Sequence, residues 1–322
     1  MSKFILDFEE PLKEIEEKIE SLKKTSFDTG IDVVDSLKEL YNRLEDEKKN
    51  IYSNLSRWQK VQLARHPLRP YTCDYIKLIT DEWFELKGDR KFAEDPSIVA
   101  GISVVDDYSV MIIGQEKGRG TRKKLKRNFG MPRPEGYRKS LRLMKLAEKF
   151  NIPILTLIDT PGAYPGIGAE ERGQAQAIAD NLFQMSTIKV PIISIVIGEG
   201  ASGGALAIGL CDKLICMENT WFSVISPEGC ASILFRDPLK ADLAADSMKV
   251  TSDDLYKMNI ADEIISEPLG GAHLDYKSSA KSLKKVFVKN LLELNRMSQE
   301  DLISLRLKKY DKIGEWIGKK NE

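Results

Sequence analysis

Apolar residues recur every three or four positions near both ends of the chain and gather into continuous runs in the middle. At the N-terminal end, one apolar stripe runs through residues 12–22 and a second runs through 37–55. This spacing predicts two amphipathic helices, and the segment 25–30 supplies the break between them. Charged residues fill the other positions, so each helix presents a narrow apolar stripe that must dock on something. Packing on the chain's own core and contact with another subunit are both open.

The middle of the chain predicts an α/β core. After two prolines that follow residue 66, we expect a helix from 72 to about 86 and then a β-hairpin with strands at 98–105 and 109–116. A helix over about 134–150 comes next, and strands and helices then alternate. We expect strands at 152–158, 192–197, 213–217 and 221–224, and helices at about 169–186 and 203–210. Alternation is typical of a largely parallel sheet, and the strand pairs favour strand–strand–helix units.

The last part of the chain is again helical. Leu283, Phe287, Leu291 and Leu294 share one face of a helix expected over 279–297. The residues that follow, Ser-Gln-Glu-Asp at 298–301, resemble a capping box that opens a final helix. The patterns therefore divide the chain into an N-terminal helical hairpin, a core and a C-terminal helical segment. We place these parts at residues 1–65, 66–272 and 273–322.

Composition and charge exclude several classes of protein. Lysine and arginine together balance aspartate and glutamate at 49 each, so the whole chain is not a general polyanion binder. No apolar run is long enough to span a bilayer, and the first residues lack the apolar region of a signal peptide, so we expect a cytoplasmic protein without membrane contact. The four cysteines form no Cys-x-x-Cys pair, which argues against a disulfide framework and a zinc site. Two histidines leave few candidates for histidine-based catalysis.

Two glycine-rich segments, each directly after an apolar strand, are the main candidates for chemistry. The first is Asp-Thr-Pro-Gly-Ala-Tyr-Pro-Gly at 159–166, and the second is Gly-Glu-Gly-Ala-Ser-Gly-Gly at 198–204. Glycine lets backbone N–H groups approach a ligand without a Cβ in the way. A helix that begins at the second segment would add its positive end to those N–H groups. Such a site suits a negatively charged oxygen, of either a phosphate or a reaction intermediate.

The second segment has three interpretations. Gly198, Gly200 and Gly203 match the dinucleotide-binding fingerprint, and Glu218 follows at about the expected distance. The next helix has room for only about two turns, and the strand follows several others, which weakens that match. Alternatively, the N–H groups of Gly203 and Gly204 form an oxyanion hole at the helix start. In the third interpretation, the glycines only allow a helix to pack closely on a strand.

Other motifs point to no further chemistry. Ser202 does not lie in Gly-x-Ser-x-Gly and has no histidine nearby in sequence, so we do not expect a nucleophile. The chain contains no Gly-x-x-x-x-Gly-Lys-Ser/Thr motif, which argues against ATP hydrolysis. Lys249 stands in Ser-Met-Lys-Val, but its flanks predict helices, whereas a biotinylated lysine lies at the tip of a hairpin. We therefore expect no covalent cofactor on this chain.

A basic stretch spans residues 117–127 and contains no acidic residue. Its cations are Lys117, Arg119, Arg122, Lys123, Lys124, Lys126 and Arg127. A solvated loop, an anchor for ligand phosphates and a nucleic-acid patch are the three interpretations. Phe129 is the one aromatic residue nearby, which argues against base stacking and therefore against nucleic-acid binding. We expect phosphate or partner binding through Lys117, Arg119, Arg122 and Arg127.

Several longer motifs, in one order, carry a resemblance to a known family. They are Arg-His-Pro at 65–67, Arg-Pro-Tyr-Thr at 69–72, Arg-Asn-Phe-Gly-Met-Pro at 127–132, Pro-Glu-Gly-Tyr-Arg-Lys at 134–139, and the segments 159–173, 198–209, 223–233 and 267–273. Over nearly its whole length the chain resembles the α subunits of bacterial acetyl-CoA carboxylase carboxyltransferase. The resemblance implies a crotonase-like α/β fold, in which strand–strand–helix units form a superhelix, with residues 66–272 as the carboxyltransferase core.

The resemblance also implies a reaction and its partners. The carboxyl group would pass from carboxybiotin, carried on a separate biotin carboxyl carrier protein, to acetyl-CoA, giving malonyl-CoA for fatty acid biosynthesis. The partners would be biotin carboxylase and a β subunit, in an α₂β₂ transferase whose zinc lies on the β subunit and not on this chain. Gly203 and Gly204 would then hold the ureido oxygen of biotin. Gly162, Ala163, Tyr164 and Gly166 would line the biotin pocket.

The chain departs from the family pattern at a few positions. Gln115 and Glu116 stand where a histidine–glutamine pair is common, Ala201 replaces a frequent glycine, and Gly120 replaces an acid. Alanine suits position 201 if its φ is negative. We expect Glu116 to weaken phosphate binding by the basic stretch beside it.

Three other functions compete with the carboxyltransferase. A stand-alone acyl-CoA hydratase or isomerase of the crotonase type would need an acid at the glycine segments, for which Glu170 and Glu171 are the candidates. An NAD-binding oxidoreductase would use the dinucleotide fingerprint. A non-catalytic scaffold would only dock the β subunit.

Overall fold

The computed structural model describes residues 4–314, and its centre is one mixed β-sheet. The strands are β1 (Glu82–Glu85), β2 (Ile98–Val105), β3 (Tyr108–Gln115), β4 (Ile154–Thr160), β5 (Ile192–Ala201), β6 (Lys213–Met217), β7 (Trp221–Ser223) and β8 (Glu263–Ile265). The order is β1-β2-β3-β4-β5-β6-β8, and β7 pairs with β5 beyond the end of β6. The first three strands are antiparallel and the others are parallel.

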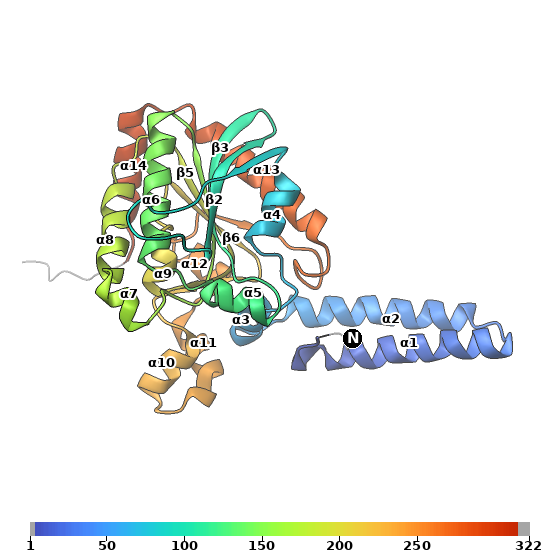
Figure 1. Cartoon of the computed structure of the whole chain (residues 1–322). Coiled ribbons are helices and arrows are strands. Elements are labelled where there is room, and N and C mark those ends of the chain that lie inside the picture. Colours follow the sequence, from blue (N-terminus) through green and yellow to red (C-terminus); the bar gives the residue numbers. More distant parts are fainter. Residues whose placement is uncertain (1–3, 315–322) are drawn as a thin grey trace, which may run out of the picture.

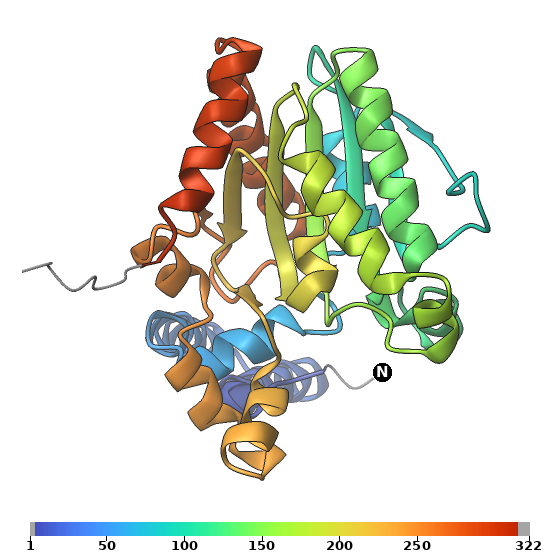
Figure 2. The ribbon, with the colours of Figure 1, turned by 90° about the vertical axis from the view of Figure 1, so that its left-hand side faces the viewer.

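Helices cover both faces of this sheet (Figures 1 and 2). On one face α6 (Pro134–Lys149) and α8 (Gln174–Met185) pack over the strands, and on the other lie α4 (Thr72–Ile79) and α13 (Tyr276–Leu294). Strand β3 shows how alternation builds the two layers. Val110 and Ile112 belong to the cluster with α4 and α13, whereas Met111 and Ile113 belong to the cluster with α6 and α8. Strands β4 and β5 are buried along their whole lengths, which explains their continuous apolar runs.

The N-terminal hairpin projects away from the sheet (Figure 1). Its helices are α1 (Glu10–Thr29) and α2 (Val34–Ser53), preceded by a 3₁₀ turn (Asp7–Glu9). The apolar stripes of α1 and α2 bury against each other, so docking on the core is confined to the base of the hairpin, where Phe4 lies edge-on to His66. The expected break at 25–30 is misplaced, because α1 continues until Gly30 adopts a left-handed φ of 69°.

The first expected core helix is too long. Helix α4 ends at Ile79, and the residues that were expected to continue it form β1, an exposed edge strand antiparallel to β2. Trp83 alone of its four residues packs on the core, so β1 has too little apolar pattern to tell a strand from a helix. The expected hairpin at 98–116 and the helix α6 are confirmed.

Two further expectations need correction. The helix expected over 169–186 is two helices, α7 (Ile167–Glu171) and α8, because Gly173 between them has a φ of 82°. The strands β6 and β7, expected as a pair, do not pair with each other, since both lie beside β5.

A small helical lobe follows β7, at residues 224–248, and we call it the α10–α11 lobe. It contains α10 (Pro227–Leu234), a 3₁₀ turn (Pro238–Lys240) and α11 (Ala241–Met248), and it extends beyond the end of the sheet (Figure 1). Helix α3 (Arg57–Ala64) packs on α11, and α12 (Ser252–Lys257) leads to β8. Lys249 is therefore flanked by helices, as the sequence predicts.

The C-terminal helices complete the fold. Helix α13 lies on the sheet through Leu283, Phe287, Leu291 and Leu294, as its periodicity predicts. Ser298 caps the last helix, α14 (Gln299–Asp311), by accepting a hydrogen bond from the N–H of Asp301 at 3.1 Å. The domain boundaries at 65 and 272 stay predictions. Within residues 4–314, none of the helices is both long and apolar enough to cross a membrane.

Candidate active site

The two glycine-rich segments lie side by side because β4 and β5 are parallel neighbours that end at the same edge of the sheet. Thr160 pairs with Gly200 at this edge. Farther on, a Cβ added to Gly204 would overlap the carbonyl carbon of Gly162 and lie 2.5 Å from the nitrogen of Ala163. Three of the predicted site residues are therefore in direct backbone contact, although about 40 positions separate them in the chain.

The second segment is mostly strand, whereas the strand was expected to end at residue 197 and to leave a glycine-rich loop before the next helix. Strand β5 continues to Ala201, and α9 (Ser202–Leu206) begins at once. Ala201 has a φ of −103°, so alanine is an ordinary residue there, and the left-handed φ of 56° falls on Ser202 instead. This sharp turn directs the first N–H groups of α9, including those of Gly203 and Gly204, out of the helix and without intrahelical partners.

The glycines within β5 have a packing role. A Cβ on Gly198 would lie 2.8 Å from the carboxyl carbon of Asp159, and one on Gly200 would overlap the ring of Phe222. Both positions are covered by side chains and do not face a ligand. Helix α9 has only five residues, and Glu218 accepts a hydrogen bond from the N–H of Glu267 at 2.9 Å. The dinucleotide interpretation therefore does not fit this arrangement.

The first segment is fixed by contacts with the starts of α6 and α8. The N–H of Tyr164 donates to the carbonyl of Pro132 at 3.0 Å, and the guanidinium of Arg133 lies 4.7 Å from the centre of the Tyr164 ring. Gln174 donates to the carbonyls of Pro132 and Tyr164 at 2.9 and 3.0 Å. A Cβ on Gly166 would overlap the Tyr164 ring, so glycine there leaves room for this tyrosine.

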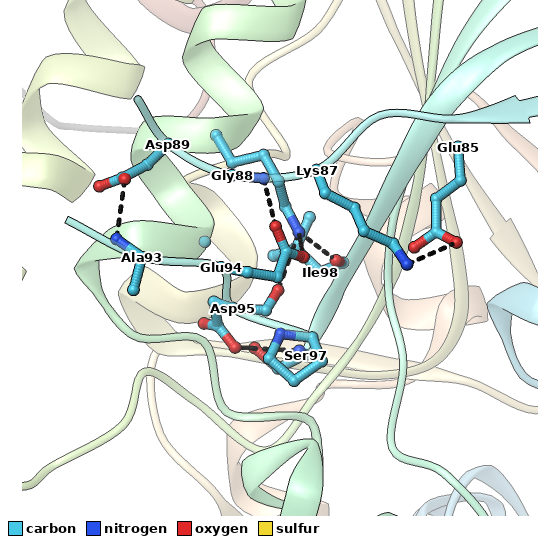
Figure 3. Close-up of polar contacts among 12 residues, drawn as sticks. Glu85, Lys87, Gly88, Asp89, Ala93, Glu94, Asp95, Ser97 and Ile98 are labelled. Atoms are coloured by element: carbon cyan, nitrogen blue, oxygen red, sulfur yellow. Dashed lines mark hydrogen bonds and ion pairs between the residues drawn. The ribbon is translucent and has the colours of Figure 1, made fainter. Parts of the chain in front are cut away.

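The loop between β1 and β2 holds the start of α6 in turn. Asp95 accepts hydrogen bonds from the N–H and hydroxyl of Ser97, as Figure 3 shows, and from the N–H of Arg133 at 2.6 Å. The buried ammonium of Lys139 donates to the carbonyls of Asp95 and Ile98 at 2.8 and 2.6 Å and pairs with Glu94. These contacts tie the loop to the helix against which the first glycine segment rests.

A buried cluster of charges joins the ends of β4 and β5. The ammonium of Lys117 lies 2.6 Å from a carboxylate oxygen of Asp159 and 2.6 Å from one of Glu199. Arg65 contacts the other oxygen of Glu199 at 2.5 Å and also pairs with Glu228. Burial by itself would lower the pKa of Lys117, but the two carboxylates outweigh it and raise that pKa above the usual range. Burial is likewise outweighed by Lys117 and Arg65 at Glu199, whose pKa is lowered.

Three of the four predicted phosphate-binding cations have partners inside the chain. Lys117 belongs to the cluster described above. Arg119 pairs with Asp74 at 2.7 Å and lies over the ring of Tyr71, and Arg127 donates to the carbonyl of Pro96 at 2.7 Å. Arg122 is exposed on the short helix α5 (Thr121–Lys126), together with Lys123 and Lys126. Phosphate or partner binding stays a prediction, and the solvent-facing cations of α5 are its best candidates.

Glu116 points into the fold, and its effect on phosphate binding by the basic stretch stays a prediction. Its carboxylate is buried and accepts hydrogen bonds from the N–H of Cys73 at 2.8 Å and of Gly118 at 3.1 Å. Cys73 stands in the first turn of α4, so Glu116 satisfies a donor at the start of that helix. The adjacent Gln115 also points inward. Its side chain donates to the carbonyl of Gly204 at 2.7 Å and accepts from the N–H of Asp159 at 3.0 Å.

Sequence reasoning missed the residues that hold the site together. Gln115 was noted only as a departure from the family pattern, Asp159 and Glu199 only as members of the glycine-rich segments, and Lys117 was assigned to a ligand. The sequence did hold one signal for these residues, because each lies at or near the end of a predicted strand, where neighbouring strands bring side chains together. Glu170 and Glu171, the candidate acids of a hydratase, are both exposed on α7 and are not the desolvated groups that such chemistry uses. Among the described residues, no group of three or more His, Cys, Asp or Glu is arranged to hold a metal ion.

Sequence comparisons agree on one family. The family model described as acetyl co-enzyme A carboxylase carboxyltransferase-like matches residues 5–314. The acetyl-coenzyme A carboxylase carboxyl transferase subunit alpha of Flavobacterium johnsoniae is 52% identical over 312 residues, covering 97% of this chain and 98% of that protein. The protein of the same name from Vesicomyosocius okutanii is 55% identical over 308 residues, covering 94% and 96%.

Solved structures share the fold at low sequence identity. A chain of the Pseudomonas malonate decarboxylase hetero-tetramer aligns with a TM-score of 0.58 at 14% identity, covering 73% of this chain and 91% of that one. A transcarboxylase 12S chain aligns with a TM-score of 0.54 at 19% identity, covering 79% of this chain. This chain spans less than half of the transcarboxylase chain, at 44%. These likenesses confirm the expected crotonase-like α/β fold.

Proposed function

The chain belongs to the acetyl-CoA carboxylase carboxyltransferase family, and we propose that its two adjoining glycine segments form the biotin side of that enzyme's active site. The enzyme transfers a carboxyl group to acetyl-CoA, giving malonyl-CoA for fatty acid biosynthesis. The observation that supports the proposed site is the backbone contact of Gly204 with Gly162 and Ala163 at the start of α9. This contact places several main-chain groups around one small volume.

The chemistry needs hydrogen-bond donors at one oxygen. When the N–CO₂ bond of carboxybiotin breaks, negative charge develops on the ureido oxygen of biotin. We assign the N–H groups of Gly203 and Gly204 to that oxygen, because they are free main-chain donors at the start of a helix. One such donor is typically worth about 3 kcal/mol of transition-state stabilisation. Tyr164 and Gly166 then form a wall of the biotin pocket beside Ala163.

The acyl-CoA half of the reaction belongs, in this proposal, to a β subunit. At that half of the site, the biotin anion takes the α-proton of acetyl-CoA. The enolate that forms then attacks the CO₂ that carboxybiotin has released, which gives malonyl-CoA. An oxyanion hole on the β subunit would hold the enolate oxygen. Carboxybiotin reaches the site as a substrate on a carrier protein, after biotin carboxylase has charged it. We place this α₂β₂ transferase in the cytoplasm and expect zinc on its β subunit.

The α10–α11 lobe is the surface that we assign to the β subunit. Six of its apolar side chains are exposed: Val224, Ile233, Leu234, Phe235, Leu239 and Leu243. The lobe starts directly after β7, whose Ser223 pairs with Ala201 beside α9. A subunit that covers this apolar surface would therefore also close the glycine site.

We keep the division of the chain into a hairpin (1–65), a carboxyltransferase core (66–272) and a C-terminal helical segment (273–322) as part of this proposal. The exposed cations of α5 (Arg122, Lys123 and Lys126) are assigned to a phosphate of CoA or to an acidic partner surface.

Reconstitution tests the proposal. The purified chain is combined with a cognate β subunit, assembly is measured by sedimentation velocity, and carboxyl transfer from malonyl-CoA to free biotin is followed. We expect transfer from the assembled complex and none from either chain alone. A complex that is demonstrably assembled and transfers no carboxyl group would contradict the proposal. Hydration of an enoyl-CoA by the chain alone would support the stand-alone enzyme instead.

A further inference from the structure

One buried amide connects the two glycine segments. Gln115 is the last residue of β3, and its side chain is fully buried. Its Nε2 donates to the carbonyl of Gly204 at 2.7 Å, and its Oε1 accepts from the N–H of Asp159 at 3.0 Å. Gly204 lies in α9 and Asp159 lies at the end of β4. From the end of β3, a single side chain thus reaches a backbone group of each segment.

The orientation of this amide is fixed by chemistry. An amide group has one end that donates and one that accepts, so only one orientation satisfies both the carbonyl of Gly204 and the N–H of Asp159. The backbone of Gln115 is held as well, since the hydroxyl of Thr72 donates to its carbonyl at 2.5 Å. Position 114 must be glycine for this approach, because a Cβ there would lie 2.6 Å from that hydroxyl oxygen.

Two successive glycines need such a contact. Without a Cβ, Gly203 and Gly204 have wide freedom in φ and ψ, so nothing intrinsic fixes the direction of their N–H groups. The carbonyl of Gly203 is held by the N–H of Ala207 at 3.0 Å, within the turn of the helix. The carbonyl of Gly204 is held by Gln115 from outside the helix. Together these two bonds fix the peptide planes on both sides of Gly204.

We propose that Gln115 is a positioning residue for carboxyl transfer: by holding the carbonyl of Gly204, it keeps the first turn of α9, which carries the N–H groups of Gly203 and Gly204, in register with the segment that begins at Asp159. The inference rests on the proposed function, because it assumes that these N–H groups meet the ureido oxygen. Gln115 itself touches no substrate. Lys117, two residues later, forms ion pairs with the side chains of Asp159 and Glu199. Gln115 therefore contacts the main chain of the two segments, and Lys117 contacts their side chains.

Two variants of Gln115 separate positioning from packing. Gln115→Met keeps the length of the side chain and removes both hydrogen bonds. We expect kcat of the assembled transferase to fall about ten- to a hundredfold, because small displacements at a reacting centre cost that much, whereas KM for malonyl-CoA stays nearly constant. The matched control is Asn181→Leu. Asn181 is also fully buried, and its amide donates to the carbonyl of Ala207 at 2.9 Å, behind α9. We expect kcat of this control within about twofold of the wild type, at a similar loss of stability.

Gln115→Glu adds a readout that packing alone does not move. When protonated, the new carboxyl group donates to the carbonyl of Gly204 and accepts from the N–H of Asp159. When ionised, it has no donor and repels that carbonyl. Burial and the carboxylates of Asp159 and Glu199 raise the pKa of the new group, against Lys117. We expect its kcat, relative to the wild type at each pH, to rise as the pH falls.

The kinetics are combined with amide hydrogen exchange of peptides that contain Gly203 and Gly204. Low kcat and fast exchange in Gln115→Met, with neither in Asn181→Leu, support the inference. A kcat for Gln115→Met equal to that of the control overturns it and leaves the proposed function intact. If the assembled wild type transfers no carboxyl group, the proposed function fails and exchange alone decides. Faster exchange in Gln115→Met than in the control then supports the positioning role, and equal exchange overturns it.

Discussion

A Cβ added to Gly204 would lie 2.9 Å from the Cα of Gly162, so these two glycines meet backbone to backbone. Sequence reasoning treated close packing and an oxyanion hole as alternative interpretations of these glycines, and this contact is compatible with both. Glycine at 204 permits close packing, and the same closeness brings the first turn of α9 to the segment after β4. Gly203 differs, since a Cβ there would meet only the side chain of Ile178 at 3.5 Å.

We therefore expect alanine to be tolerated at position 203 and not at position 204. We expect Gly204→Ala to displace the Gly162–Ala163 peptide and to lower kcat of the assembled transferase about a hundredfold. Gly203→Ala has space and no left-handed φ to satisfy, so we expect kcat within about threefold of the wild type. Steady-state kinetics of both complexes check this. Equal losses in the two variants would show that the backbone contact does not matter for turnover.

Leu239 and Phe27 form a matched pair for testing the assembly surface. Each side chain is 90% exposed, so replacement by glutamate leaves the folded chain stable. Leu239 lies in the α10–α11 lobe, whereas Phe27 lies near the end of the hairpin that projects from the core (Figure 1). We expect Leu239→Glu to weaken binding of the β subunit at least about tenfold and Phe27→Glu to leave it unchanged. Sedimentation velocity of the mixed subunits measures both, and the opposite ranking would move the interface to the hairpin.

Lys117 is predicted to stabilise the fold strongly. Lys117→Met would leave the buried carboxylates of Asp159 and Glu199 facing each other without their shared cation. We expect the free energy of unfolding to fall by about 3–5 kcal/mol, as for other broken buried ion pairs. Lys123→Met, on the exposed surface of α5, is the control and should change it by less than about 0.5 kcal/mol. Urea denaturation measures the free energy of unfolding of both variants. Equal losses in the two would show that Lys117 is solvated and not part of a buried ion pair.

His66 predicts a loss of stability in mild acid. Burial is the main cause that lowers its pKa to about 4, and Arg69 adds to it, against a backbone hydrogen bond with Phe4. The unfolded chain takes up a proton at His66 near its ordinary value of 6.5, whereas the folded chain resists it. Stability is therefore lost as the pH falls from about 6.5 towards 4, and protonation would also disturb the stacking on His273 at a centroid distance of 3.9 Å.

The comparison of wild type with His66→Gln isolates this effect, since the other titrating groups are common to both proteins. We expect the wild type to lose stability relative to the variant between pH 7 and pH 4.5, measured by thermal unfolding at each pH. A difference that does not change with pH would mean that His66 titrates normally in the folded chain.

The fold was predictable where periodicity and length agree. The hairpin at 98–116, the buried strands β4 and β5 and the helix α6 have strong patterns and were placed within a few residues. The edge strand β1 was taken for helix because it is short and only Trp83 packs inward. Gly173 divides an expected helix because it adopts a left-handed φ. Whether a glycine does so depends on its tertiary surroundings, which the local sequence does not specify.

The site was predictable only in its glycines. Lys117 was assigned to a ligand because it opens a basic stretch, residues 117–127, that contains no acidic residue. Its partners Asp159 and Glu199 come from the ends of β4 and β5, which the sheet brings beside the end of β3. Gln115 contacts Gly204 across 89 positions of the chain. Such contacts depend on strand order, which local patterns do not specify.

The central claim is that the N-terminal end of α9 binds the oxyanion that forms on biotin. The most direct test is a structure of the assembled α–β complex with biotin bound, determined at a resolution that places the ureido group. We predict the ureido oxygen within about 3.1 Å of the nitrogen of Gly203 or Gly204, with Ala163 and Tyr164 beside the bicyclic ring. A ureido oxygen bound elsewhere, with both of these N–H groups turned away from it, would contradict the account.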